Sequence, residues 1–146
     1  MLMKELTIQA LIENIPAVTD FVEEQLAPLH FSRKAMIQLA VAIDEIFSNI
    51  AKYAYDDNGG EATVRVETET DPEAAVITFI DNGEPFDPLA KKEPDLTLDA
   101  EERKIGGLGI FLVKKSMDGI SYEYKDGHNI LRIKKKPGQE GQKTGK

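Results

Sequence analysis

The segment from Ala35 to Ala54 constrains the fold of this chain more than any other feature. It contains no Gly or Pro, and Ser32 stands just ahead of it, where a hydroxyl can cap a helix. Apolar residues recur along the segment at helical spacing. The candidate buried positions are Ile37, Leu39, Ala40, Ile43, Ile46, Phe47 and Ile50. We therefore expect one long helix that is largely covered by other elements.

Shorter segments with strand or helix patterns flank this helix on both sides. Alternating or continuous apolar residues predict strands at 4–10, 62–69, 74–80, 119–125 and 129–134. Helical spacing predicts a helix at 17–26, where Pro16 suits the first turn, and another that continues to Met117. Asp126-Gly127 lies between the last two strands and is a strong hairpin signal. This order of elements fits an α+β fold, a two-layer sandwich of helices on a sheet.

Length and charge bound the number of domains and the kinds of partner. The chain has 146 residues and a formal net charge of −8, with 41% hydrophobic and 30% charged residues. These values are typical of one soluble globular domain, which we expect to span residues 1–136. The composition of 137–146 predicts a disordered basic tail. The negative charge disfavours direct binding to a nucleic-acid backbone, because such binding needs clustered cations.

The chain also lacks several features that mark other compartments and site types. It has no Cys, which excludes disulfides and thiolate metal sites. No stretch approaches the roughly 20 apolar residues that cross a bilayer, and the start of the chain lacks the apolar core of a signal peptide. We therefore expect a cytoplasmic protein. His30 and His128 are far apart in sequence and are expected to be surface residues.

Glu45 and Asn49 form the first candidate site, within the long helix. They are four residues apart, so their side chains lie on one helix face, about one turn of roughly 5.4 Å apart. Magnesium often takes only one or two oxygen ligands from protein, so the Asn49 carbonyl oxygen suits this role. Glu45 is then free to polarise a hydroxyl or a water. Taken alone, such a pair is more often a solvated helix edge.

Asp81 falls at the carboxyl end of the predicted strand 74–80, before a turn-forming stretch that includes Gly83, Pro85 and Pro88. An ionised Asp only accepts hydrogen bonds, so Asp81 could accept one from the exocyclic amine of an adenine. Gly83 lacks a Cβ and would let the backbone approach the flat base. In isolation, the same residues favour a simple turn.

Gly106, Gly107, Leu108 and Gly109 lead into the last predicted helix. Flexible backbone at a helix amino terminus presents free amides and a partial positive charge, which suits phosphate binding. The stretch is not a P-loop, because no Gly-Lys-Ser or Gly-Lys-Thr is present, and it is not G-x-G-x-x-G. A lone Gly-Leu-Gly more often indicates tight helix packing.

The irregular stretch from Leu89 to Ile105 is a further candidate region. A loop of this length inside a compact domain is usually functional or disordered. Arg103 is the preferred cation for contact with phosphates, because its fork can hold two oxygens at once. The other candidate cations are Lys91, Lys92 and Lys104. For any one of these four, a solvated position is the commoner outcome.

Taken together and in this order, the three pieces resemble the GHKL superfamily, the ATPase fold shared by gyrase, histidine kinases and mismatch-repair ATPases. The matching residues are Glu45 and Asn49 for its N box, Asp81 and Gly83 for its first glycine box, and Gly107 and Gly109 for its second. The pattern Asp-x-Gly-x-Pro-Phe-Asp-Pro, followed by Gly-Gly-Leu-Gly-Ile-Phe-Leu, is similar to the small bacterial anti-sigma-factor serine/threonine kinases. The resemblance covers the chain from Leu6 to Lys134. It implies a fold of the Bergerat type, with a mixed, mainly antiparallel sheet covered on one face by helices.

The resemblance implies an ATP-dependent protein kinase that is also an anti-sigma factor, with ATP and Mg²⁺ as cofactors. Glu45 would take the proton from an incoming Ser hydroxyl, and Asn49 would bind magnesium. The implied ATP-binding residues are Asn49, Asp81, Gly83, Arg103, Gly106, Gly107, Leu108 and Gly109. The stretch 89–105 corresponds to the lid that closes over ATP. The implied partners are a sigma factor and a STAS-type anti-sigma-factor antagonist as substrate, and the resemblance also suggests a homodimer.

Tyr53 departs from the pattern of this branch. Many relatives have Asn-x-x-x-His-x-Tyr where this chain has Asn49, Tyr53 and Tyr55. Tyr53 cannot shuttle a proton near neutral pH as His can, which puts catalytic efficiency in question rather than binding. The alternative hypothesis is therefore an ATP-gated protein-binding regulator without significant kinase activity. A detached histidine-kinase catalytic domain or a simple ATPase is a weaker third hypothesis.

Overall fold

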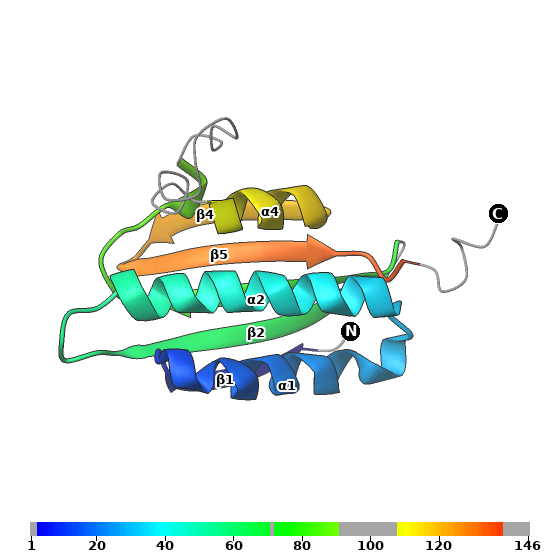
Figure 1. Ribbon diagram of the computed structural model, residues 1–146, viewed down its shortest axis with the longest axis horizontal. Helices are drawn as coiled ribbons and strands as arrows, with labels where there is room; N and C mark the ends of the chain where they lie inside the picture. The colour runs from blue at the N-terminus through cyan, green and yellow to red at the C-terminus, as the bar shows by residue number, and fades with distance from the viewer. Residues whose placement is uncertain (1–2, 71, 91–107, 139–146) are drawn as a thin grey trace.

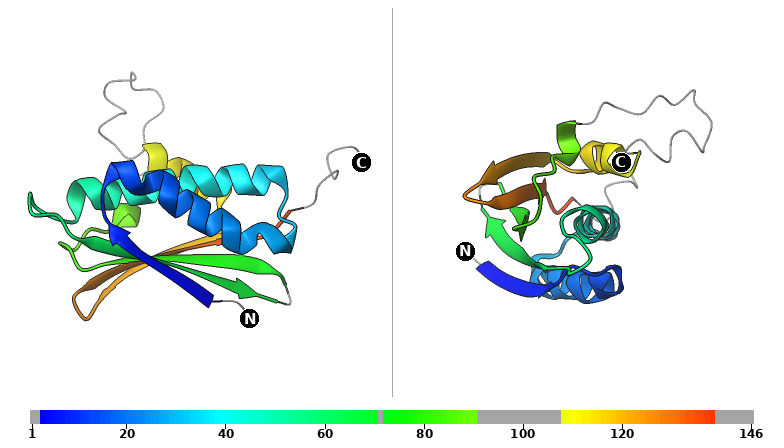
Figure 2. Two further views of the ribbon diagram at one scale, coloured as in Figure 1. Left: turned by 90° about the horizontal axis from the view of Figure 1, so that it is seen from below. Right: turned by 90° about the vertical axis from the view of Figure 1, so that its left-hand side faces the viewer.

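The structure is a computed structural model that describes residues 3–70, 72–90 and 108–138, without the side chain of Leu108. The strands are β1 (Met3–Gln9), β2 (Glu61–Glu69), β3 (Ala74–Asp81), β4 (Gly119–Lys125) and β5 (His128–Lys135). The helices are α1 (Ile15–Leu26), α2 (Arg33–Tyr53) and α4 (Leu108–Ser116), with short 3₁₀ turns η1 (Ile12–Asn14), η2 (Ala27–Leu29) and η3 (Pro88–Ala90). The strands form a five-stranded sheet in the order β1-β2-β3-β5-β4, and the helices cover one face of it (Figures 1 and 2).

This architecture confirms the predicted two-layer α+β sandwich. Each pairing between neighbouring strands of the described sheet is antiparallel. In the helix layer, α2 lies between α1 and α4 (Figure 1). The pleat of β2 turns Val64 and Val66 toward the helices and leaves the alternate residues half-buried on the other face.

The long helix begins as the sequence predicts. Ser32 is its N-cap, and its Oγ accepts a hydrogen bond from the Ala35 amide at 3.0 Å. The buried stripe of α2 is Ala35, Leu39, Ala42, Ile43, Ile46, Phe47 and Ile50.

The prediction that Ile37 is buried is wrong, because its side chain is 57% exposed. Ile37 comes two residues before Leu39, so it points about 200° away from the buried stripe. Ala40, also predicted to be buried, is half-buried. The covered face of α2 is therefore narrower than its apolar content indicates.

Local turn chemistry explains the last hairpin. Asp126 and Gly127 both have positive φ, 54° and 81°, as the predicted two-residue turn between β4 and β5 requires. This turn fixes the pairing of Tyr124 with Asn129. In the hairpin between β2 and β3, Asp71 lies outside the described residues.

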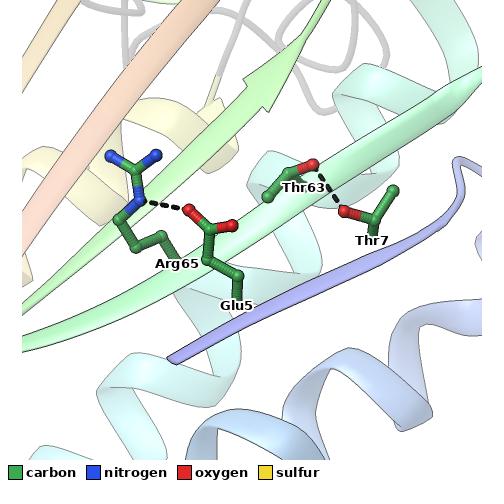
Figure 3. A network of polar contacts seen from close by, with 4 residues as sticks. All are labelled: Glu5, Thr7, Thr63 and Arg65. Carbon is green, nitrogen blue, oxygen red and sulfur yellow. Dashed lines mark hydrogen bonds and ion pairs between the residues drawn. The ribbon is translucent and has the colours of Figure 1, made fainter. Parts of the chain in front are cut away.

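On the sheet face away from the helices, two cross-strand pairs join β1 to β2 (Figure 3). Arg65 Nε lies 2.6 Å from Glu5 Oε2, and the Thr7 and Thr63 hydroxyls lie 2.8 Å apart. Each pair is directly opposed in the strand register, which is where cross-strand side chains interact best. They hold the edge strand in place against its single neighbour.

The remaining predictions for the chain concern its carboxyl-terminal tail, membrane-spanning helices and the two histidines. Pro137 is tied to the domain, since its carbonyl accepts a hydrogen bond from the Ser32 amide at 2.8 Å. Residues 139–146 of the predicted tail lie outside the described residues. Within the described part of the chain, no helix has the length and apolar character needed to cross a membrane. His30 and His128 are both exposed, as expected.

Candidate functional site

A pocket lies at one end of the molecule, between the carboxyl-terminal half of α2, the carboxyl end of β3 and the start of β5. It occupies about 400 Å³, including its open side. Its lining residues are Ile46, Asn49, Ile50, Ala54, Phe79, Asp81, Phe86, Pro88, Tyr122, Asn129 and Leu131. The pocket is thus mostly apolar with a few polar groups, a composition typical of small-molecule sites. It brings together Asn49 and Asp81, which are distant in sequence and were both predicted to bind a nucleotide.

Asp81 is the last residue of β3 and is only 5% exposed. Its Oδ1 accepts hydrogen bonds from the Gly83 amide and from Asn129 Nδ2, both at 2.9 Å. Among the described residues, no hydrogen bond falls on Oδ2. The carboxylate is therefore held firmly by one oxygen while the other can accept from a donor in the pocket.

Asn129 supports Asp81 from the neighbouring strand, and sequence reasoning missed it. It is paired with Asp81 in the register of β3 and β5. Its Nδ2 also donates to the Glu84 carbonyl at 2.8 Å, and its Oδ1 accepts from the Phe86 amide at 3.1 Å and from the Tyr122 hydroxyl. The side chain of Asn129 is thus fully used in fixing the loop after β3.

Burial raises the pKa of the Tyr122 hydroxyl, and the charges of Asp87 and Asp81 raise it further against a hydrogen bond at Phe86 that lowers it. Tyr122 therefore stays protonated near neutral pH and can donate to Asn129. Tyr122, Asn129 and Asp81 thus form a hydrogen-bonded chain in the pocket lining, in which two neutral side chains donate toward one carboxylate.

Gly83 is required by packing against the end of α2. A Cβ built on Gly83 would lie 2.1 Å from the Ala54 carbonyl oxygen. The next residue, Glu84, donates its amide to that same oxygen at 2.8 Å. The steric reason for glycine here is thus the contact with Ala54 and not the approach of a base; a contact between Gly83 and a nucleotide stays a prediction.

Glu45 and Asn49 lie side by side on α2, as their spacing predicts. Asn49 Nδ2 donates to Glu45 Oε2 across 3.4 Å, and both side chains are half-buried. This bond uses the amide nitrogen of Asn49 and leaves its carbonyl oxygen without a hydrogen bond among the described residues. That oxygen is a hard ligand, and the described residues hold no cluster of three or more His, Cys, Asp or Glu that would form a protein-only metal site. The arrangement fits a magnesium ion that takes most of its ligands from phosphates and water.

Gly109, in the first turn of α4, lies against the Glu45 carboxylate. A Cβ built on Gly109 would lie 2.1 Å from Glu45 Oε1 and 2.6 Å from Oε2. The first turn of α4, which carries the positive end of its helix dipole, therefore lies beside Glu45. Leu108 begins this helix, which places its backbone at the same end.

Three predicted site residues, Arg103, Gly106 and Gly107, lie outside the described residues, as do the lysines of the predicted lid. Their contacts with phosphates stay predictions. The described residues therefore include those predicted to contact the base and the metal, and only part of the predicted phosphate site.

Two tyrosines after Asn49 contact residues on the far side of the end of α2. The ring of Tyr53 lies 5.3 Å from that of the pocket residue Phe86, with the planes tilted by 35°. The Tyr55 hydroxyl lies 2.6 Å from the Glu61 carbonyl and 2.7 Å from Asn82 Oδ1. It also accepts from the Asn82 amide at 3.1 Å. Tyr55 thus links the end of α2 to the turn that follows Asp81.

Comparison with known proteins places the chain in a family. The histidine kinase-like ATPase domain matches residues 8–135. This chain belongs to that family. The resemblance drawn from its motifs is thereby confirmed, and the ATPase domain accounts for nearly all of the described sheet and helices.

Relatives within the histidine kinase-like ATPase family include named protein kinases. The chain is 33% identical over 109 residues to "Serine-protein kinase RsbW" of Listeria monocytogenes serovar 1/2a (strain ATCC BAA-679 / EGD-e). This match covers 71% of this chain and 68% of the relative. The chain is 26% identical over 103 residues to "Serine/threonine-protein kinase BtrW" of Bordetella bronchiseptica (strain ATCC BAA-588 / NCTC 13252 / RB50), covering 70% and 72% of the two chains.

A solved structure supports the fold of this ATPase domain. The crystal structure of the RsbU and RsbW domains of Rv1364c from Mycobacterium tuberculosis superposes with a TM-score of 0.66 at 14% identity. The match covers 93% of this chain and 32% of the larger one. At this identity the comparison supports the fold alone.

Proposed function

We propose that this chain is an ATP-dependent serine/threonine protein kinase and anti-sigma factor that phosphorylates an anti-sigma-factor antagonist in a partner-switching system. The observation that carries the proposal is the pocket itself, in which Asn49 and Asp81 line one cavity, each with one side-chain oxygen that accepts no hydrogen bond from the described residues. The named kinases among the relatives support the same chemistry.

The polar groups of the site would each contact a different part of a bound nucleotide. Asp81 Oδ2 would accept from the adenine amine, while Asn49 Oδ1 would hold a magnesium ion, which neutralises phosphate charge. The amides at the start of α4, with Leu108 and Gly109, face the phosphates. Arg103, Gly106 and Gly107 are proposed to complete the phosphate site.

Glu45 lies beside both the metal end of the pocket and the start of α4, where a γ-phosphate would sit. It is proposed to accept the proton of the substrate Ser hydroxyl as that oxygen bonds to the γ-phosphorus. The bond from the γ-phosphorus to the bridging oxygen breaks, and ADP leaves with the electron pair. Positioning and charge neutralisation supply most of the acceleration in such transfers.

The proposed partners follow from the same branch of the family: a sigma factor, and a STAS-type antagonist that receives the phosphate. A homodimer and a cytoplasmic location are part of the proposal. The proposal does not include direct binding to nucleic acid, because the chain carries a net charge of −8.

Replacing one carboxylate tests the role of Glu45. With labelled ATP and a STAS-type antagonist, Glu45→Gln should abolish transfer of label to Ser or Thr while nucleotide still binds. Asp44→Asn is the matched control, because it removes an exposed carboxylate from the adjacent position of the same helix. Transfer by Glu45→Gln at the wild-type rate would show that Glu45 is not the base.

The contact between Tyr53 and Phe86 favours a second candidate function. Tyr53 stands at the position where many relatives have His, and its ring packs on the pocket residue Phe86 without offering a proton carrier near neutral pH. The alternative is an ATP-gated protein-binding regulator. In that case the wild-type protein would bind ATP and a partner, and no label would reach the antagonist over hours.

A further inference from the structure

A wide groove opens at the end of the molecule opposite to the nucleotide pocket. It runs between the start of α2, the end of α4 and the end of β5. These three ends lie together on one side of Figure 1. From Lys34 in this groove to Asn49 in the pocket, α2 extends for fifteen residues, or roughly 22 Å. A ligand in the groove therefore does not touch the nucleotide site.

The groove concentrates positive charge on an acidic protein. It is lined by five basic side chains and one acidic side chain, whereas the whole chain has a net charge of −8. The basic residues are Arg33, Lys34, Lys115, Lys135 and Lys136. The acidic one is Asp118, whose Oδ2 accepts a hydrogen bond from the Lys136 amide at 2.7 Å.

Three of these lysines are available to a partner. Lys34, Lys115 and Lys136 are exposed, and none forms an ion pair within the described residues. Lys115 Nζ lies 5.3 Å from the centre of the Phe111 ring, which favours a defined position for its charge. Lys135 is committed to the fold, since its Nζ donates to the Ser116 carbonyl at 2.7 Å.

Backbone contacts hold the walls of the groove together. The Ser32 amide donates to the Pro137 carbonyl at 2.8 Å, and the Asp118 amide donates to the Lys134 carbonyl at 2.9 Å. A Cβ built on Gly138 would lie 2.9 Å from Ser32 Oγ, so the chain after β5 passes directly over the helix cap. The groove is therefore formed by the fold and does not need a ligand to assemble it.

An apolar strip lies beside the charges. Ile37 lines the groove and is 57% exposed, and Val41, one turn further along α2, is 53% exposed. Neither residue is covered by another described element. A ligand that pairs with the lysines can bury these two side chains as well.

We propose that this groove binds an acidic segment of a partner protein, with carboxylates paired to Lys34, Lys115 and Lys136 and an apolar side chain packed on Ile37. Charge complementarity identifies the occupant. Extended polyanions such as DNA or an anionic membrane would also meet the negative remainder of the surface, which repels them. A short acidic segment contacts the positive groove alone.

Paired charge reversals test the proposal in the full chain. The probe is a short fluorescein-labelled peptide of aspartate and glutamate with a central leucine, and its binding is followed by fluorescence anisotropy at physiological ionic strength. The variants are Lys34→Glu/Lys115→Glu in the groove and Lys4→Glu/Lys125→Glu as the matched control. The control makes the same change in net charge at exposed lysines of β1 and β4, outside the groove.

The groove variant should lose about tenfold or more in affinity for the peptide, and the control should keep the wild-type value, since distant charges are screened. Ile37→Ser should weaken binding several-fold. Equal loss in both double variants, or no binding to the wild-type protein, would overturn the proposal. So would groove-dependent binding of duplex DNA or phosphatidylserine vesicles in place of the peptide. The affinity for ATP should be unchanged in both double variants, which separates this outcome from that of the proposed kinase function.

Discussion

The backbone of Gly109 lies so close to the Glu45 carboxylate that no Cβ fits between them. The built Cβ would stand 2.1 Å from Oε1, well inside the van der Waals distance. This contact joins the long central helix to the first turn of α4. It links a residue proposed to accept a proton with the helix end proposed to hold phosphates.

Gly109→Ala is therefore expected to displace the Glu45 carboxylate. The atoms that the new Cβ would meet are the end of a flexible side chain, and alanine favours a helix over glycine, so the free energy of unfolding should change little. Urea unfolding measures the change, and the labelled transfer assay should show reduced phosphorylation. Gly119→Ala is the control, because its Cβ would meet only Lys134 Cβ at an ordinary 3.5 Å. If Gly109→Ala transferred label at the wild-type rate, the position of Glu45 beside Gly109 would not matter for transfer.

The hydrogen bond between Asp81 and Asn129 can be tested by exchanging the two side chains. Asn129→Asp replaces the donor that faces Asp81 Oδ1 at 2.9 Å with a second carboxylate. Two buried carboxylates in contact should destabilise the protein by about 1–3 kcal/mol or more. Asp81→Asn in the same chain restores one donor and one acceptor.

The double variant should therefore be more stable than Asn129→Asp alone. Urea unfolding of the two single variants and the double variant gives the coupling energy of the pair. Additive changes would mean that Asp81 and Asn129 do not interact.

Tyr55 should make stability depend on alkaline pH. Burial is the main cause that raises its pKa, and a hydrogen bond at Asn82 partly opposes this. The folded protein therefore keeps the proton of Tyr55 when the unfolded chain has lost it. The resulting stabilisation is complete below the unfolded pKa of about 10 and is lost as pH rises through the higher folded pKa.

Comparison of wild type with Tyr55→Phe isolates this contribution. Tyr122, whose pKa is also raised, and Lys135, whose pKa is lowered, contribute equally to both proteins and cancel in the difference. The stability difference, from urea unfolding at a series of pH values, should narrow above about pH 10. Tyr124→Phe removes a hydroxyl from an exposed tyrosine and is the control. A difference that is constant across this range would contradict the assignment.

Local signals were enough to predict most of the fold. The Ser32 cap, the Gly- and Pro-free run after it and the Asp126-Gly127 turn each act within a few residues, so the sequence predicts them directly. The spacing of Glu45 and Asn49 is also local, because a helix fixes which side chains share a face.

The remaining features depend on contacts between distant segments. Asn129 meets Asp81 only because β5 pairs with β3 in a particular register, and a single Asn in a strand carries no motif. Ile37 was predicted to be buried, since apolar spacing does not show how wide a face its neighbours cover. The need for glycine at position 83 arises from Ala54, which no pattern around Gly83 indicates.

Asp81 is proposed to accept a hydrogen bond from the adenine amine of a bound ATP. Isothermal titration calorimetry with magnesium should show ATP binding to the wild type and much weaker binding of GTP, whose base presents an acceptor where adenine has its amine. Asp81→Asn should weaken ATP binding by about 1–3 kcal/mol, while Asp20→Asn, at an exposed position of α1 outside the pocket, should leave it unchanged. Equal affinities for ATP in the wild type and Asp81→Asn would contradict the account.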